Sequence, residues 1–353
     1  MFQKYKLEGT PYEIGHQHGK LAKDKITNSI IIYKEMFKTF ANLDWQSAYE
    51  NVEKYIPFIE SFDVDIMEEI RGIADGSGYE LNDILILNAR SELMFSTQML
   101  EGCTSFATTP EISGGKLFVG QNWDWGPGQK DSVVIFEIEQ KNKPNILMIT
   151  EAGLVGKIGF NSSGVSICLN ALMTNLNRPG TPLHIVMRGV LNSWNFDEAM
   201  AKVANSNIAS AVNFIIGYED ESVANIEVIP DDFEVILPEN GIITHTNHIT
   251  SSRLLTKVDD LIKDMHPDTV IRFERSRELF LEAGEVNIDK IKNVLSDHFN
   301  YPNSICRHED PQMLESEQLC TVFSMIINLK SRELHLTEGK PCESKYERIT
   351  FEK

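Results

Sequence analysis

A glycine and a cysteine, Gly102 and Cys103, lie together where a helix-like segment gives way to a strand-like one. A thiolate is a strong nucleophile, but a free thiol with a pKa near ~8.5 is mostly protonated at neutral pH and needs a base or a cation. If the Cys103 thiol attacked the Gly102 carbonyl, the amide would become a thioester. Hydrolysis would then free an α-amino group that titrates near ~8 and can act as a general base. A buried structural cysteine is the more common explanation of a lone Gly-Cys pair.

A candidate partner for such an amine follows in the stretch "VGQNWDW". In an extended strand, Asn122 and Asp124 share one face, and Trp123 and Trp125 share the other. A carboxylate on the polar face would orient the new amine and hold its hydrogen-bond geometry. The alternative is a carboxylate that caps a turn at the end of the strand.

Further polar candidates lie in three later segments. Alternation in "GVSICLNAL" puts Cys168 and Asn170 on a face of small polar groups, which either lines a ligand or is simply hydrogen-bonded. Asn247 in "THTNH" offers two uncharged N–H donors, which suit an oxyanion hole. Arg307 in "NYPNSICR" could lower the pKa of a thiol and hold a substrate carbonyl or carboxylate, or it could pair with one of the many acidic residues.

The histidines allow a different chemistry. His16 and His18 of "GHQHG", together with His245 and His248, offer four imidazoles of the kind that bind zinc. Such short histidine pairs are common by chance, and zinc sites usually add a clearer carboxylate or thiolate pattern. A zinc hydrolase is therefore the weaker alternative.

Composition restricts the partners and the compartment. The 353 residues carry a net charge of −19, which disfavours nucleic acids and anionic membranes. The first fifteen residues contain no apolar run of signal-peptide length. The five cysteines are scattered and odd in number, with no CxxC pair, so neither a disulfide framework nor a thiolate zinc site is expected. We expect a cytoplasmic protein with reduced thiols.

Hydrophobic periodicity divides the chain near Cys103. The first hundred residues are predicted to be mainly helical, with one helix face carrying apolar residues every three or four positions between Ile59 and Ile73. After Cys103 the period becomes two, and strands are predicted in nine segments: "SVVIFEIEQ", "ILMITEAG", "GVSICLNAL", "AVNFIIGYE", "VANIEVIP", "FEVILPE", "GIITHTNH", "CTVFSMIINL" and "ELHLTEG". Helices are expected around residues 183–204, 268–283 and 288–298, which gives packed layers of sheet and helix.

The order of the motifs carries more information than any one of them. The series "GCTSF", "GQNWDW", "TEAGLVGKIGFNSSGVSICLNAL", "THTNH" and "NYPNSICR" resembles the acyl-CoA:6-aminopenicillanate (isopenicillin N) acyltransferase family of N-terminal-nucleophile (Ntn) hydrolases. It is more distantly similar to the choloylglycine hydrolases. The segments "GTPYEIGHQHG" and "EEIRGIADGSG" extend the resemblance over nearly the whole chain.

The resemblance implies an α+β fold, a four-layer αββα sandwich, and self-cleavage between Gly102 and Cys103. Residues 1–102 would be a mainly helical pro-region and residues 103–353 the catalytic part, within one integrated fold. The implied site residues are Cys103 as nucleophile and, through its freed amine, as base; Asp124 to hold the amine; Asn247 as oxyanion donor; Asn170 as a second donor or amine neighbour; and Arg307 as electrostatic partner of the thiol.

The expected activity is that of an amide hydrolase or acyltransferase working through a Cys103 acyl-enzyme. The expected partner is a small-molecule amide or acyl thioester; no cofactor or metal is expected, and acyl-CoA would serve only as an acyl-donor substrate. The two chains would stay associated, and a homo-oligomer is open. Two alternatives remain at this point: the zinc hydrolase described above, and a non-enzymatic binding protein in which the site has lapsed.

Overall fold

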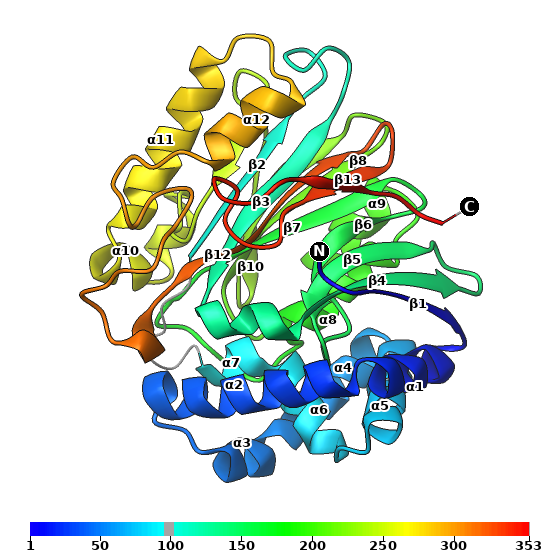
Figure 1. Cartoon of the computed structure of the whole chain (residues 1–353). Coiled ribbons are helices and arrows are strands. Elements are labelled where there is room, and N and C mark those ends of the chain that lie inside the picture. The colour runs from blue at the N-terminus through cyan, green and yellow to red at the C-terminus, as the bar shows by residue number, and fades with distance from the viewer. Residues whose placement is uncertain (95–101, 353) are drawn as a thin grey trace.

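The structure is a computed structural model that describes residues 1–94 and 102–352 (Figure 1). Leu100 and Glu101, which precede the Gly-Cys pair, lie outside the described residues. The helices of the N-terminal part are α1 (Pro11–Leu21), α2 (Lys23–Ala41), α3 (Trp45–Asn51), α4 (Ile56–Phe62), α5 (Val64–Ser77), α6 (Leu81–Asn88) and α7 (Arg90–Met94), with the 3-10 helix η1 (Val52–Tyr55). Later helices are α8 (Leu183–Leu191), α9 (Phe196–Ala204), α10 (Ile262–Met265), α11 (Asp268–Glu282) and α12 (Ile288–Leu295), with η2 (Pro127–Ser132), η3 (Leu254–Thr256) and η4 (Glu315–Glu317).

The described strands form two sheets. In spatial order, an eight-stranded sheet contains β1 (Lys4–Gly9), β4 (Val133–Gln140), β5 (Ile146–Glu151), β6 (Ile158–Asn161), β7 (Val165–Ala171), β8 (Val212–Tyr218), β9 (Val223–Ile229) and β10 (Asp232–Ile236). A six-stranded sheet contains β11 (Ile242–His245), β2 (Gly102–Thr108), β3 (Phe118–Trp125), β12 (Cys320–Asn328), β13 (Glu333–Leu336) and β14 (Glu347–Ile349). Neighbouring strands are antiparallel except for β1 and β4, which are parallel.

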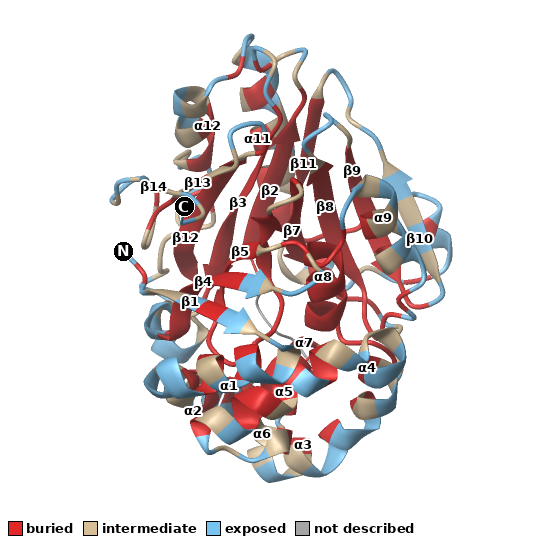
Figure 2. Ribbon diagram, turned by 90° about the vertical axis from the view of Figure 1, so that its right-hand side faces the viewer, coloured by how far each residue is buried: buried red, intermediate tan, exposed pale blue. Residues whose placement is uncertain are grey.

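The central strands of both sheets are buried on both faces, which Figure 2 shows as continuous red ribbons. On one face of the six-stranded sheet, β2 and β3 pack against β7 of the eight-stranded sheet. On the other face, α11 and α12 cover the six-stranded sheet over a second apolar cluster that includes Phe106, Phe280 and Ile291. Helices α8 and α9 pack on β6, β7 and β8 of the eight-stranded sheet. Strand β2 is thus enclosed by sheet on one side and helix on the other.

The N-terminal part is joined to the rest by both sheet and helix. Strand β1 adds to the edge of β4, with Lys4 opposite Ile135 and Gly9 opposite Gln140. In α2, the Ser29 hydroxyl donates to the carbonyl of Ala152 at 2.8 Å. The part before Cys103 therefore completes a sheet that the later residues form.

Two helices of the N-terminal part approach closely because each has two glycines four residues apart. These are Gly15 and Gly19 of α1, and Gly72 and Gly76 of α5. A Cβ atom at Gly15 would lie 2.0 Å from the carbonyl oxygen of Glu69, so the helix backbones touch directly. No described helix is both long and apolar enough to cross a bilayer.

The alternating pattern predicted the strands well: the nine predicted strand segments after Cys103 correspond to β4, β5 and β7–β13. The helix predicted between Ile59 and Ile73 is wrong in one respect, because Asp63 interrupts it. Asp63 has an extended backbone and accepts a hydrogen bond from Asp65 N, so it caps α5 and ends α4. The helix predicted at 183–204 is likewise two helices, separated by Asn195, which caps α9.

Candidate active site

The strand register places Gly102 and Cys103 on opposite faces of the six-stranded sheet. Gly102 lies opposite Asp124 of β3, and Cys103 lies opposite Trp123. Because side chains alternate along a strand, Cys103 and Trp123 face the apolar cluster between the sheets. Gly102 and Asp124 face the layer of α11. The prediction that Asp124 and Trp123 lie on different faces is confirmed by this register.

Asn247 is held against the backbone of the cysteine. Strand β11 pairs with β2 so that His245 lies opposite Ser105, which brings Asn247 level with Cys103. The Cys103 N–H donates to Asn247 Oδ1 at 2.9 Å, and Asn247 Nδ2 donates to the Ala171 carbonyl at 3.2 Å. Both ends of the amide are therefore fixed, with its N–H group between β2 and β7.

Arg272 of α11 is a central residue that the sequence did not reveal. Its Nη1 donates to the Cys103 carbonyl at 2.6 Å and to Thr104 Oγ1 at 3.1 Å. Its Nη2 donates to Asn247 Oδ1 at 3.0 Å, and its Nε pairs with Asp268 Oδ2 at 3.0 Å. A buried guanidinium thus fixes the strand, the asparagine and the helix relative to one another.

Asp124 lies directly against Gly102. A Cβ atom at Gly102 would lie 2.9 Å from Asp124 Oδ2 and 3.1 Å from Arg307 Nε, so only a glycine fits without displacing these groups. Asp124 Oδ1 accepts a hydrogen bond from Thr321 Oγ1 at 2.7 Å. Among the described residues, no donor makes a hydrogen bond to the buried Oδ2, and its ion-pair contact with Arg307 Nε is long, at 3.4 Å.

The charges around this junction alternate. Arg307 donates to Asn303 Oδ1 at 2.7 Å and pairs with Asp268, which in turn pairs with Arg272. Burial raises the pKa of Asp124 above its usual value, although Arg307 and Arg272 act in the opposite direction. Burial also acts to raise the pKa of Asp268, but there Arg307 and Arg272 outweigh it and the pKa is lowered. Asp124 is therefore the carboxylate whose charge is less well compensated.

Asn170 is close to β2 but does not bond to the Gly102–Cys103 junction. Its Oδ1 accepts from Ser105 Oγ at 2.5 Å and from Asn213 Nδ2 at 3.1 Å, and its Nδ2 donates to the His245 carbonyl at 3.4 Å. Ser105 is two residues from Cys103 on the same face of β2. The structure therefore gathers Cys103, Asp124, Asn247 and Arg307 around the junction, whereas Asn170 bonds further along the strand.

A buried lysine lies on the same side of the sheet as the Cys103 side chain. Lys157 Nζ is 3.4 Å from the ring centroid of Trp123 and forms an ion pair with Glu151, which also pairs with Arg90 Nη2 at 3.1 Å. Burial lowers the pKa of Lys157 to about 8, whereas Glu151 and, more weakly, Cys103 act to raise it. Lys157 lies in the stretch "TEAGLVGKIGFNSSGVSICLNAL" quoted above, but nothing in that stretch predicts that its charge lies beside Trp123.

The four histidines proposed as zinc ligands do not form one site among the described residues. His18 accepts from Gly153 N at 2.9 Å, and burial lowers its pKa to about 3, so its ring is neutral. His245 bonds to Glu227 Oε1 at 2.8 Å, and His248 contacts Thr269 Oγ1 at 3.1 Å. His16 is on α1, stacked on Tyr12. The zinc hydrolase built on His16, His18, His245 and His248 is therefore not supported.

Comparison with known proteins identifies the family. The model of the acyl-coenzyme A:6-aminopenicillanic acid acyl-transferase family matches residues 112–343. The chain is 31% identical over 346 residues to the acyl-coenzyme A:6-aminopenicillanic-acid-acyltransferase 40 kDa form of Emericella nidulans. This alignment covers 95% of this chain and 92% of that protein. This chain belongs to the acyl-coenzyme A:6-aminopenicillanic acid acyl-transferase family.

The chain is also similar, at lower sequence identity, to proteins other than this acyl-transferase relative. An uncharacterized protein of Archaeoglobus fulgidus is 22% identical over 84% of this chain and 58% of its own length. A variant of the conjugated bile acid hydrolase from Clostridium perfringens aligns with 71% of this chain and 98% of its own, with a TM-score of 0.50 and 11% identity. That similarity concerns the fold, and it agrees with the two-sheet α+β architecture of this acyl-transferase family member.

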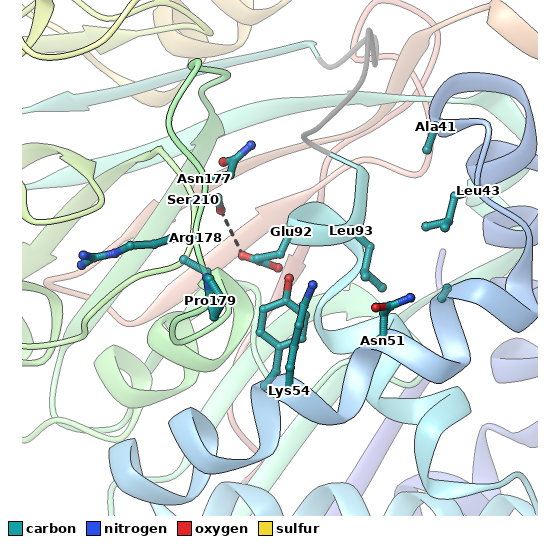
Figure 3. Close-up of a pocket in the computed structure, with 13 residues that line it drawn as sticks. Ala41, Leu43, Asn51, Lys54, Glu92, Leu93, Asn177, Arg178, Pro179 and Ser210 are labelled. Carbon is teal, nitrogen blue, oxygen red and sulfur yellow. Dashed lines mark hydrogen bonds between the residues drawn. The ribbon is translucent and has the colours of Figure 1, made fainter.

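Two cavities adjoin the candidate site and the helix before it in the described part of the chain. One, of about 250 Å³, is lined by Arg307 and Asp268 and therefore reaches the charged side of the junction. Another, of about 340 Å³, lies beside α7 (Figure 3). In it, Glu92 accepts from Ser210 Oγ at 3.1 Å and from Leu183 N at 2.8 Å, while the side chain of Arg178 points away from Glu92.

Glu92 gives a prediction about pH. Burial raises its pKa from the usual 4.5 to about 6, although the bonds from Leu183 and Ser210 oppose this. The folded state thus binds the Glu92 proton more tightly than the unfolded state does. Protonation of Glu92 therefore stabilises the fold fully below pH 4.5, and this contribution is lost as the pH rises through about 6. We expect Glu92→Gln to raise the free energy of unfolding at pH 8 by roughly 1–2 kcal/mol, with no gain at pH 4.5. Urea unfolding at both pH values measures this, and a variant less stable than the parent at pH 8 contradicts it.

Proposed function

We propose that the chain is a self-processing cysteine enzyme that hydrolyses amides or transfers acyl groups from amides or thioesters. The observation that carries the proposal is Asp124 Oδ2, a buried acceptor that lies against Gly102 and receives no hydrogen bond from the described residues. A buried carboxylate oxygen without a hydrogen bond is costly. An α-amine freed at Cys103 would supply the missing donor.

The processing step follows from the position of the junction. The Cys103 sulfur attacks the Gly102 carbonyl carbon, the carbon–nitrogen bond breaks, and the nitrogen takes a proton to become the α-amine. Water then hydrolyses the Gly102 thioester, which restores the Cys103 thiol and leaves a carboxylate on Gly102. Asn247 accepts from the Cys103 nitrogen that would become the new terminus, and Arg272 donates to the carbonyl of the same residue.

The mature site would use the same groups for turnover. The α-amine of Cys103 accepts the thiol proton, and the thiolate attacks the acyl carbon of the substrate. Asn247 Nδ2 carries two N–H groups, and the one that does not bond to the Ala171 carbonyl is the proposed oxyanion donor. Arg307 lines the adjoining cavity and supplies a positive charge for the polar end of a substrate. The acyl-enzyme is then resolved by water or by an amine.

The fold supports this proposal. We assign to it the four-layer αββα sandwich, because α11 and α12 cover one sheet, β2 and β3 pack on β7, and α8 and α9 cover the other sheet. We also assign residues 1–102 as the pro-region and residues 103–353 as the catalytic part. The two would stay associated through β1 and α2. The names of the relatives point to acyl thioesters as donors and to amines as acceptors.

The test is to trap the acyl-enzyme. Processed protein is mixed briefly with a phenylacetyl thioester, acid-quenched and examined by intact mass spectrometry and peptide mapping. We expect an added acyl group on Cys103 of the 103–353 fragment, which disappears when an amine acceptor is added and the amide product forms. Transfer or hydrolysis that leaves Cys103 unmodified at every quench time, and that persists after Cys103 is alkylated, would overturn the proposal.

Asn247 provides a graded test of the oxyanion role. We expect Asn247→Ala to lower kcat by about 10²–10³-fold, because one oxyanion donor is worth roughly 3–4 kcal/mol in the transition state. Steady-state kinetics on protein confirmed to be processed separates this loss from a change in KM. The control is Asn161→Ala, another buried asparagine, whose amide donates to the carbonyls of Leu191 and Ser193. An equal loss of kcat in both variants would argue against a specific role for Asn247.

A further inference from the structure

Two cysteines and two histidines that are far apart in the sequence converge beside the loop that carries Arg307. Cys306 Sγ is 3.5 Å from Cys342 Sγ and 3.8 Å from His308 Nε2. Cys342 Sγ is 3.4 Å from His308 Nε2, and His298 Nε2 is 3.1 Å from His308 Nε2. All four ligand atoms lie within 4.8 Å of one another. None of them belongs to the histidines considered from the sequence.

Four of the six separations among these ligand atoms are close to those of a tetrahedral metal site. Bonds of ~2.3 Å from zinc to sulfur and ~2.0–2.1 Å to nitrogen place the ligand atoms of a tetrahedron ~3.3–3.8 Å apart. The four separations given above span 3.1–3.8 Å, and the other two are no longer than 4.8 Å. We propose that His298, Cys306, His308 and Cys342 bind one zinc ion in a closed Cys2His2 site. Four protein ligands leave no open position, so the ion is structural.

The ligands are held in place by the backbone around them. Cys306 N donates to the Asp297 carbonyl at 3.0 Å, and His308 N donates to the Pro302 carbonyl at 3.0 Å. The chain segment with Cys306 and His308 is thus folded back on the segment with His298. Cys342 and His298 are exposed, so an ion can enter from solvent. A preformed and accessible set of this kind needs little rearrangement to bind a metal.

A carboxylate lies near one of the histidine ligands, on the side away from the cluster. Glu343 Oε1 is 3.8 Å from His308 Nδ1, the ring nitrogen that faces away from the cluster, which is longer than a hydrogen bond. Zinc-binding histidines commonly direct their second nitrogen to a carboxylate, which fixes the tautomer that leaves the other nitrogen free for the metal. With two thiolates, the zinc ion would be electrically neutralised by its own ligands.

The site would act on the catalytic part through Arg307. Arg307 lies between the ligands Cys306 and His308, and its guanidinium pairs with Asp124 and Asp268. A metal that cross-links residues 298, 306, 308 and 342 would fix the backbone on both sides of this arginine. The proposal differs from the expectation of a metal-free protein, which rested on the absence of a CxxC pair. It does not depend on the proposed function.

The metal content of the purified chain tests the site. The protein is produced without an affinity tag in zinc-supplemented medium and purified anaerobically with a reductant and without chelator. We expect about one zinc per chain by mass spectrometry of the metal, and less than ~0.1 in Cys342→Ser and His298→Ala, whose side chains are exposed in the described structure. Cys320→Ser, which alters a cysteine outside the cluster, should keep its zinc. Cobalt exchanged into the wild type should give the visible bands of a tetrahedral thiolate site, and these bands should be lost in Cys342→Ser.

Three results would overturn the proposal. The first is wild-type protein without bound metal in which both Cys306 and Cys342 react as free thiols. The second is a Cys306–Cys342 disulfide in the anaerobically purified protein, detected by peptide mapping. The third is zinc that remains unchanged in both Cys342→Ser and His298→Ala, because the ion would then lie elsewhere. Circular dichroism of each variant confirms that loss of zinc is not loss of the fold.

Discussion

Cys103→Ala should be recovered as one uncut chain of residues 1–353, whereas the wild type should yield fragments 1–102 and 103–353. In the proposed mechanism the sulfur of Cys103 attacks the Gly102 carbonyl, so the alanine variant would not be cleaved and no α-amine would form beside Asp124. Losing the nucleophile and the base together removes the covalent route entirely, so we expect kcat to fall by at least ~10⁴-fold. Intact mass spectrometry of freshly purified protein and an amide-release assay measure the two effects.

The control for Cys103 is another buried cysteine on the facing sheet. Cys168 lies in β7, and burial raises the pKa of its thiol, so it is protonated at neutral pH and unreactive. Cys168→Ala should therefore be cut after Gly102 as in the wild type. A wild-type chain that stays whole on long incubation and still turns over substrate would refute the free-amine mechanism. Cleavage in Cys103→Ala would point to an external protease.

The second large effect concerns stability. Arg272→Met should lower the free energy of unfolding of the uncut Cys103→Ala chain by about 3–5 kcal/mol, because it breaks a buried charge network without replacing it. The side chain of Arg272 is buried, and its loss leaves the Cys103 carbonyl, Asn247 Oδ1 and Asp268 without a shared donor. Denaturant unfolding, followed by tryptophan fluorescence, measures the change in one covalent form of the chain.

Arg275 is the matched control for Arg272. It lies on the same helix but is partly exposed, and it pairs with Asp297 and Glu278 at the surface. Surface ion pairs contribute little, so Arg275→Met should cost less than ~1 kcal/mol. If the two substitutions destabilise the chain equally, Arg272 is not the structural centre of the junction.

Local patterns in the sequence predicted much of the fold. Alternation of apolar and polar residues is a direct consequence of strand geometry, so strands such as β4 and β7 could be read from it. The same rule separated Asp124 from Trp123. Strand β1, by contrast, was not predicted, because its partner β4 lies more than a hundred residues away and its own pattern is short. The pairing of two distant strands cannot be predicted from the sequence of either strand alone.

Residues that lie at the Gly102–Cys103 junction could be named from the sequence where motifs are local, and were missed where their position depends on packing. Asp124 and Asn247 were inferred from short motifs. Arg272, however, is one of several arginines on an amphipathic helix, and only the position of α11 over β2 distinguishes it. The cluster of His298, Cys306, His308 and Cys342 was missed for the same reason, because its residues span 298–342 and only the fold brings them together.

The parallel pairing of β1 with β4 has a consequence for how the processed protein refolds. In the uncut chain β1 reaches β4 within one molecule; if the proposed cleavage occurs, the same strand addition becomes an encounter between two molecules. Refolding of the uncut chain should therefore be independent of protein concentration, while refolding of the mature pair should slow on dilution. The uncut chain would unfold and refold reversibly. The lifetime of the cleaved protein would instead be set mainly by its rate of unfolding, which is kinetic stability.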